Sequence, residues 1–123
     1  MPARLRIADA ADVSAALARL AATAPDETPD RADLRLLVKH FMAVLEARAP
    51  GHSVEVRVPP YAAVQVVPGV RHTRGTPPAV VETDAETWIA LATGTLTWAE
   101  AAGSGAVAAS GQRADLAPWL PLT

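Results

Sequence analysis

The chain has 123 residues, the size of one domain, and we expect a single domain over residues 1–123. A net charge of −2 and the lack of a basic, aromatic-rich run argue against nucleic-acid binding. The absence of cysteine excludes disulfides, thiol nucleophiles and cysteine-bound zinc, and no stretch reaches the roughly 20 apolar residues of an integral membrane helix.

The N-terminal residues 1–29 are expected to form a helix and a linker ahead of the main domain. Asp9 and Asp12 interrupt the apolar residues there, so the segment does not resemble a secretory signal and we expect a cytoplasmic protein. Residues 9–24 are alanine-rich, and their larger apolar side chains share one helical face with an alanine. These are Val13, Ala16, Leu17 and Leu20. The proline-containing segment TAPDETPD then predicts a linker.

A second helix is predicted from Asp30, whose side chain can cap free backbone N–H groups, to the break at Pro50. Its apolar residues recur at helical spacing, and Arg35, Lys39 and Glu46 occupy the opposite face. The apolar residues are Leu34, Leu37, Val38, Phe41 and Leu45. This periodicity predicts a helix with one face in the core.

Three strands are predicted next. Valines alternate with Glu55 and Arg57 over residues 54–58, which indicates a half-buried strand. Two prolines at 59–60 force a turn, and residues 61–67 resume as a second strand, antiparallel to the first because the connection is short. Residues 68–78 are expected to be a loop, followed by a third strand at 79–82.

Two short helices and a fourth strand complete the prediction. Thr83 and Glu86 have capping-box spacing for one helix that ends at Gly94, and residues 97 and 100 repeat the spacing for a second helix. Gly103 and Gly105 are expected to end that helix, ahead of a strand at 106–110. The tail should close the core in a last helical turn. This order of elements, with helices first, then strands, then helices and a late strand, predicts an α+β domain. Helices should cover one face of the sheet, and the other face should be partly exposed to solvent.

The spacing of residues in the C-terminal half resembles the sterol-carrier-protein-2 domain. The matching positions are Trp88, Leu91, Gly94, Leu96, Ala101, Gly105, Val107 and Gly111. The segments RAPGHSVEVRVPP, RHTRGTPPAVVETD and WIALATG are more similar still to the small bacterial orthologues of that domain. The resemblance covers residues 30–122. It implies an SCP2-like fold with about five strands in a mostly antiparallel sheet, covered on one face by helices, and an apolar cavity that takes a sterol, a fatty acid or acyl-CoA.

We therefore expect a ligand site between sheet and helices. The predicted cavity wall consists of Val38, Phe41, Leu45, Val56, Val64, Trp88, Leu91 and Trp98. Arg71 and Arg74 are the candidates for an anionic head group, since guanidinium groups donate forked hydrogen bonds to carboxylates and phosphates. The alternative is that these arginines belong to a solvated loop and pair with Glu55 or Glu82. The tryptophans could likewise serve core packing alone.

Catalytic and metal sites find no support. No histidine pair has ligand spacing, and no serine lies in a G-x-S-x-G elbow. We expect neither metal nor cofactor, and a non-enzymatic protein that binds an apolar small molecule or lipid. The alternative is an accessory module with a collapsed cavity, paired with an enzyme or forming a homodimer through an edge strand near Pro59 or at Ala106–Ser110. An isomerase or hydrolase, the third option, would need a cluster of titratable residues in a cleft.

Overall fold

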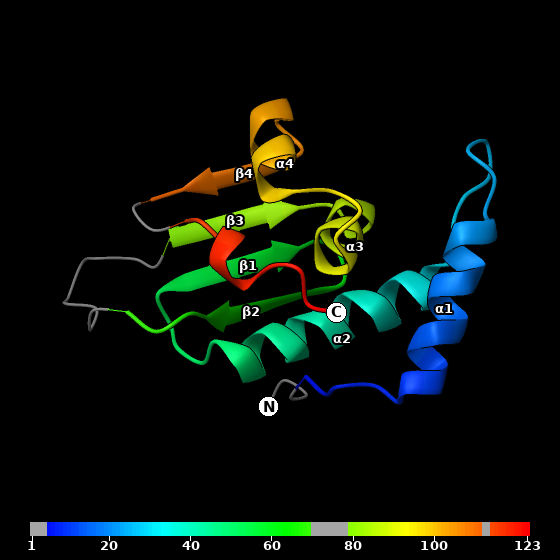
Figure 1. Ribbon diagram of the computed structural model, residues 1–123, viewed down its shortest axis with the longest axis horizontal. Coiled ribbons are helices and arrows are strands. Elements are labelled where there is room, and N and C mark those ends of the chain that lie inside the picture. Colours follow the sequence, from blue (N-terminus) through cyan, green and yellow to red (C-terminus); the bar gives the residue numbers. More distant parts are fainter. Residues whose placement is uncertain (1–4, 70–78, 112–113) are drawn as a thin grey trace.

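The computed structural model describes residues 5–69, 79–111 and 114–123. Within these ranges it contains four α-helices, four strands and one 3₁₀ turn (Figure 1). In chain order they are α1 (Ala10–Ala22), α2 (Arg31–Arg48), β1 (Val54–Val58), β2 (Ala62–Val66), β3 (Ala79–Thr83), α3 (Ala85–Thr93), α4 (Trp98–Ser104), β4 (Val107–Ser110) and η1 (Ala117–Trp119). The α+β class predicted from the sequence is confirmed.

The four strands form one open sheet in the order β2-β1-β3-β4. β1 and β2 pair antiparallel, as the short connection predicts, and β3 and β4 also pair antiparallel. The central pair, β1 and β3, is parallel, so Val54 lies beside Ala79 and Val56 beside Val81. The expected fifth strand is not found among the described residues.

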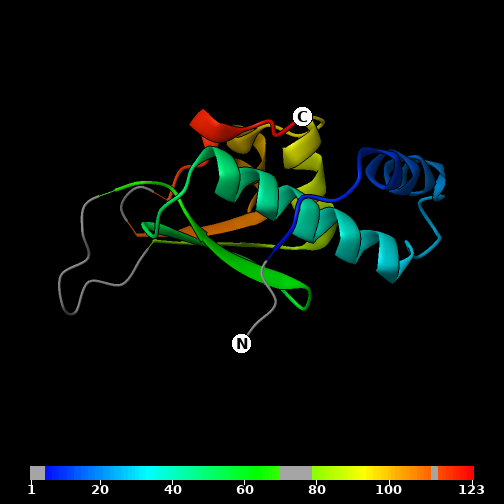
Figure 2. The same ribbon diagram turned by 90° about the horizontal axis from the view of Figure 1, so that it is seen from below.

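One face of the sheet is buried and the other faces solvent. In β1 the valines at 54, 56 and 58 are fully buried, whereas the side chains of Glu55 and Arg57 point to the opposite face and form an ion pair there at 3.1 Å. Helices α2 and α3 and the C-terminal tail lie together on one side of the sheet in the view of Figure 2. The predicted alternation and the helix-covered face are therefore both confirmed.

Helix α2 is the main buried helix. Asp30 caps it by accepting from the backbone N–H groups of Ala32 and Asp33, as predicted. Its inward face packs against α3 and against the buried valines of the sheet, so the core lies between the helix layer and the sheet. The residues of this face with exposures of 1% or less are Leu37, Val38, Phe41, Met42 and Leu45.

Helix α3 begins at a different cap from the one expected. Asp84 caps it by accepting from the N–H of Thr87, whereas the Thr83 hydroxyl donates to the carbonyl of Ala106 at 2.7 Å and so joins β3 to the start of β4. The predicted capping box of Thr83 and Glu86 is therefore wrong. The physical reason is that Thr83 ends a strand whose alternation points its side chain inward, so the next residue makes the cap.

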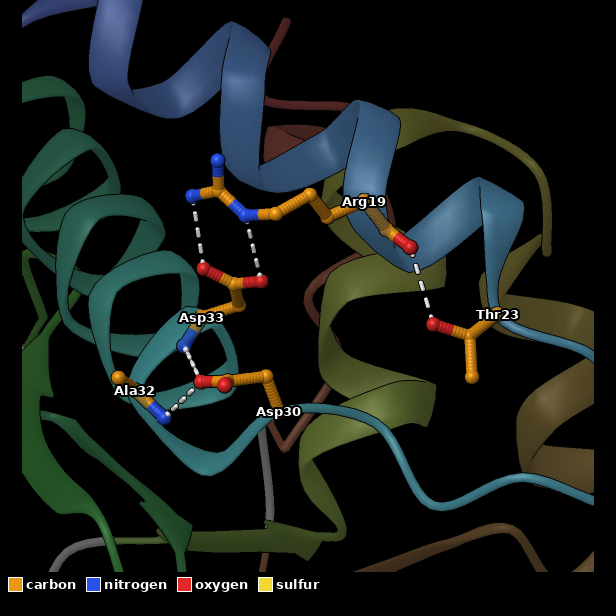
Figure 3. A network of polar contacts seen from close by, with 5 residues as sticks. All are labelled: Arg19, Thr23, Asp30, Ala32 and Asp33. Carbon is orange, nitrogen blue, oxygen red and sulfur yellow. Dashed lines mark hydrogen bonds and ion pairs between the residues drawn. The ribbon is translucent and has the colours of Figure 1, made fainter.

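Helix α1 lies beside the N-terminal end of α2 and away from the sheet (Figure 1). Arg19 on α1 donates two hydrogen bonds of 2.9 Å to the two carboxylate oxygens of Asp33 on α2 (Figure 3). The Arg19 side chain is 61% exposed and that of Asp33 only 12%. Asp33 is thus shielded on α2 and held by a bidentate contact from the helix that precedes the main domain.

Candidate functional site

The predicted cavity wall is brought together by the fold, and most of it is closely packed core. Seven of the eight residues are buried, with exposures between 0% and 7%. They are Val38, Phe41, Leu45, Val56, Val64, Trp88 and Leu91. Trp98 is half-buried at the edge of the same cluster. The helix layer and the sheet therefore touch through these side chains.

The two predicted head-group residues, Arg71 and Arg74, lie outside the described residues. Their role stays a prediction from the sequence. The alternative for these arginines is an ion pair with Glu55. In the structure Glu55 already accepts hydrogen bonds from the Arg57 guanidinium, which would compete with such a pair.

An apolar pocket of about 350 Å³ lies where the end of α3, the start of α4 and the C-terminal tail meet. We call it the corner pocket. It is lined by Leu91, Gly94, Leu96, Thr97, Trp98, Ala99, Ala117, Leu120 and Pro121. Of the predicted wall, Leu91 and Trp98 line it, so these two residues connect the core to an open surface.

The turn between α3 and α4 shapes the corner pocket. Gly94 adopts a φ of 83°, a left-handed conformation that residues other than glycine rarely adopt, and the backbone N–H groups of Thr95 and Leu96 donate to the carbonyl of Ala90. Thr97 then starts α4 with a complete capping box to Glu100, as predicted. The chain thus reverses within four residues and leaves Leu96 and Trp98 on the pocket wall.

The C-terminal tail supplies the opposite wall. Leu122 donates its N–H to the carbonyl of Ala92 at 2.8 Å, and Arg48 donates to the carbonyl of Pro121 at 3.3 Å. Leu116 and Leu122 are buried on either side of the wall residues Leu120 and Pro121. The tail is therefore fastened to α3 and α2 at one end of the pocket. The sequence suggested that the tail closes the core, but no local pattern indicated that the closure leaves a pocket.

The lining of the corner pocket carries almost no polar chemistry. Among its nine residues only Thr97 and Trp98 have polar side-chain atoms, and the Thr97 hydroxyl is already bonded to Glu100 at 2.8 Å. The indole N–H of Trp98 has no hydrogen-bond partner in the part of the chain that the structure describes. The pocket can bury an apolar group beside one donor, and none of its lining side chains is an acid or a base.

None of the described titratable groups with a shifted pKa lines this pocket, although Glu100 is bonded to the lining residue Thr97. The Arg19 guanidinium beside Asp33 lowers the pKa of that carboxyl, and hydrogen bonds from Thr97 lower the pKa of Glu100. Burial lowers the pKa of His40, whose Nδ1 accepts the N–H of Ala8 at 3.0 Å. Across residues 5–69, 79–111 and 114–123, no three His, Asp or Glu side chains converge as metal ligands, and no helix is long and apolar enough to cross a membrane.

Comparison with known proteins identifies one family. The family model described as "Bacterial SCP ortholog" matches residues 30–122, which leaves α1 and the segment before it outside the match. No curated protein matches the chain. The matched range contains every strand, the buried helix α2 and the whole of the corner pocket.

Proposed function

The chain belongs to the bacterial SCP ortholog family, and from this premise we propose that it is a non-enzymatic carrier for an apolar or amphipathic small molecule. A fatty acyl chain, a sterol or a similar lipid is the ligand class. The observation that supports this most directly is the corner pocket, whose lining is almost wholly apolar and includes the half-buried Trp98.

Binding would proceed by burial of the ligand's apolar part. Leu91 lines the corner pocket and is also 1% exposed within the core, so it separates the pocket from the interior wall residues Phe41 and Trp88. A short apolar chain fits in the pocket alone. A longer chain would have to move Leu91 or the tail and enter the layer between helices and sheet. Each buried CH₂ group of the ligand then contributes about 0.8 kcal/mol.

The polar end of the ligand would remain at the mouth of the pocket. Among the lining side chains, the Trp98 indole N–H is a donor without a partner in the described residues, and it suits a carboxylate, hydroxyl or ester oxygen. The sequence-based candidates Arg71 and Arg74 would add positive charge only if their loop reaches this mouth. Their substitution by glutamine therefore tests a separate part of the proposal.

Native mass spectrometry of protein purified without detergent tests the carrier function. We expect an added mass that matches a lipid, and quenching or a shift of tryptophan fluorescence when fatty acids are added to the delipidated chain. The variant Ala99→Phe fills the pocket mouth and should lose both signals. Ala102→Phe is the control, because Ala102 is exposed on the same helix and does not line the pocket. Mass spectra without an added lipid mass, together with unchanged tryptophan fluorescence when sterols and fatty acids are added, would count against the carrier function.

The second candidate is an accessory module that associates through the sheet. Strand β4 lies at one edge of the sheet, and its residues Ala108, Ala109 and Ser110 are exposed. The closely packed layer between α2, α3 and the sheet favours this function over a large preformed tunnel. The same mass spectra separate the two, since a ligand-free dimer supports the module and a monomer with bound lipid supports the carrier. Proline at Ala109 would then be expected to dissociate the dimer.

A further inference from the structure

The N-terminal segment 5–9, which we call the arm, runs alongside α2 before α1 begins (Figures 1 and 2). It is fastened there by the hydrogen bond from the N–H of Ala8 to Nδ1 of His40. Between the arm and α2 lies a pocket of about 520 Å³, which we call the arm cleft. Its lining consists of Leu5, Arg6, Ala8, Ala32, Arg35, Leu36 and Lys39.

Three of these seven side chains are cations, and none is an acid. Arg6 comes from the arm, and Arg35 and Lys39 come from neighbouring turns of α2. The ion pairs of the described residues join Arg19 to Asp33 and Arg57 to Glu55, so the three cleft cations have no carboxylate partner among those residues. Leu5 and Arg6 also line a neighbouring pocket, whose lining includes the carboxylate of Glu46, but no ion pair joins Arg6 to Glu46 among the described residues.

Like charges four residues apart on a helix destabilise it, because their side chains are neighbours. Arg31, Arg35 and Lys39 repeat this spacing along α2, and Arg6 adds a further positive charge from the arm. An anion held among these groups would relieve the repulsion. Two guanidinium groups and an ammonium group offer donors suited to the oxygens of a phosphate or carboxylate.

The other four residues of the cleft are apolar, so the cleft should prefer anions that carry an apolar part. Leu5 and Leu36 are half-buried and pack against the core, and Ala8 and Ala32 complete the surface beside the cations. A volume of about 520 Å³ lies in the range typical of small-molecule sites, roughly 300–1,000 Å³. The ligand should therefore join an anionic head to a short aliphatic portion.

We propose that the arm cleft is a binding site for an amphiphilic anion, with a phosphate or carboxylate head on Arg6, Arg35 and Lys39 and an aliphatic part on Leu5 and Leu36. The inference goes beyond the carrier function, because the corner pocket and the arm cleft share no lining residue. One wall of the cleft, the arm, also lies outside the residues that match the family. Either site can therefore fail without the other.

Octyl phosphate is the probe, and inorganic phosphate and 1-octanol separate its charge from its chain. In a titration of the full ¹⁵N-labelled chain followed by NMR, octyl phosphate should shift the amide signals of residues 32–39 and bind more tightly than either control. Arg35→Gln and Lys39→Gln should each weaken binding about threefold, and an ionic strength of about 1 M should weaken it further. Arg57→Gln is the charge-matched control and should bind like wild type, because Arg57 lies on the exposed sheet face.

Three results would overturn the proposal. Equal binding of 1-octanol would show that the charges do not contribute. Shifts confined to the residues around Leu96 and Trp98 would assign the ligand to the corner pocket. The same anionic chemistry could also come from a lipid headgroup in a bilayer, so sedimentation with phosphatidylglycerol vesicles is measured in parallel. If the protein binds the vesicles but not octyl phosphate, the three cations form a flat surface that binds anionic membranes, and the arm cleft is not a small-molecule site.

Discussion

The indole N–H of Trp88 donates a hydrogen bond to the carbonyl oxygen of Val38, 3.3 Å away and 50 positions earlier in the chain. Trp88 is fully buried, and the contact joins α3 directly to the middle of α2. A tryptophan in this place adds a large apolar area to a core that is otherwise rich in alanine and valine. It also satisfies its one polar atom within the core, so the burial carries no uncompensated donor.

We expect Trp88→Ala to destabilise the fold by about 3–5 kcal/mol, since it leaves a large cavity between α2 and α3. Trp88→Phe retains a ring and loses the donor, and should cost about 1–2 kcal/mol. Urea unfolding followed by circular dichroism measures both. Trp119→Phe is the control, because Trp119 is only partly buried in η1. A Trp88→Ala variant as stable as this control would mean that the core does not depend on the α2–α3 contact.

Two glycines of α4 should respond in opposite directions to alanine. Gly103 lies inside the helix, and a Cβ atom added there would meet open space, so Gly103→Ala should stabilise the chain by up to about 1 kcal/mol. Gly105 ends the helix with a φ of 80°, and alanine there should cost about 1–2 kcal/mol although its Cβ would have no atom within 4 Å. Thermal unfolding of the two variants side by side tests the assignment. Equal effects would contradict the placement of the helix end at Gly105.

Local signals predicted most of the secondary structure. The cap at Asp30, the box of Thr97 and Glu100, and the left-handed Gly94 are each encoded within a few residues, and each is confirmed. The cap predicted at Thr83 is instead made by Asp84, because the Thr83 hydroxyl is bonded to the carbonyl of Ala106 at the start of β4, a contact that no local pattern reveals. Gly103 was expected to help end α4, but the helix continues through Ser104 because a helical glycine is tolerated at modest cost.

The pairing of the strands and the positions of the pockets were harder to predict from the sequence. The parallel register of β1 and β3 depends on a long connection, which no local pattern specifies. Alternation and helical periodicity identified Phe41, Val56 and Trp88 as inward-facing, and burial confirms that they are. The same pattern describes a packed core and a cavity wall equally well. The corner pocket and the arm cleft both require a chain terminus to lie against a helix, and only the fold supplies that information.

The contact between Arg19 and Asp33 should tie α1 to the main domain without dominating stability. Arg19→Gln is expected to lower the melting temperature by no more than about 5 °C and to raise hydrogen exchange in α1, because the arginine is mostly exposed. Asp33→Asn should have the larger effect, since Asp33 is the shielded partner and its negative charge also lies in the first turn of α2, where it is favourable to the helix dipole. If both variants leave α1 exchange unchanged, the helix is held by its apolar face, through buried Ala16 and the partly buried Val13, Leu17 and Leu20.

The pH dependence of the same pair has a definite sign. Arg19 lowers the pKa of Asp33, so the unfolded chain binds a proton more readily than the folded chain in the acid range. The pair's contribution is complete above the ordinary aspartate pKa of about 3.9 and is lost as the pH falls through the folded value. Acid unfolding of the Asp33→Asn variant should therefore show a smaller loss of stability below about pH 4 than wild type. Parallel acid curves for the two proteins would contradict this.

His40 should make the arm respond to mild acid. Its Nδ1 can accept the N–H of Ala8 only while that nitrogen is unprotonated, and burial lowers the pKa of the ring because the charged form is poorly solvated there. Between the ordinary histidine pKa of about 6.5 and the lower folded value, the unfolded chain binds more protons. Stability is therefore fully present above about pH 6.5, falls as the pH drops through the folded value, and then levels off.

His40→Gln tests this directly, because glutamine can still offer an oxygen to the Ala8 N–H but does not titrate. We expect the variant to be close to wild type in stability at pH 8 and to lose less stability between pH 7 and about pH 5. His40→Phe removes the acceptor altogether and should free the arm at every pH, with increased hydrogen exchange at Ala8 as the readout. If wild type and His40→Gln lose stability in parallel over this range, the imidazole does not hold the arm, and the arm cleft must be formed by the packing of Leu5 against the core instead.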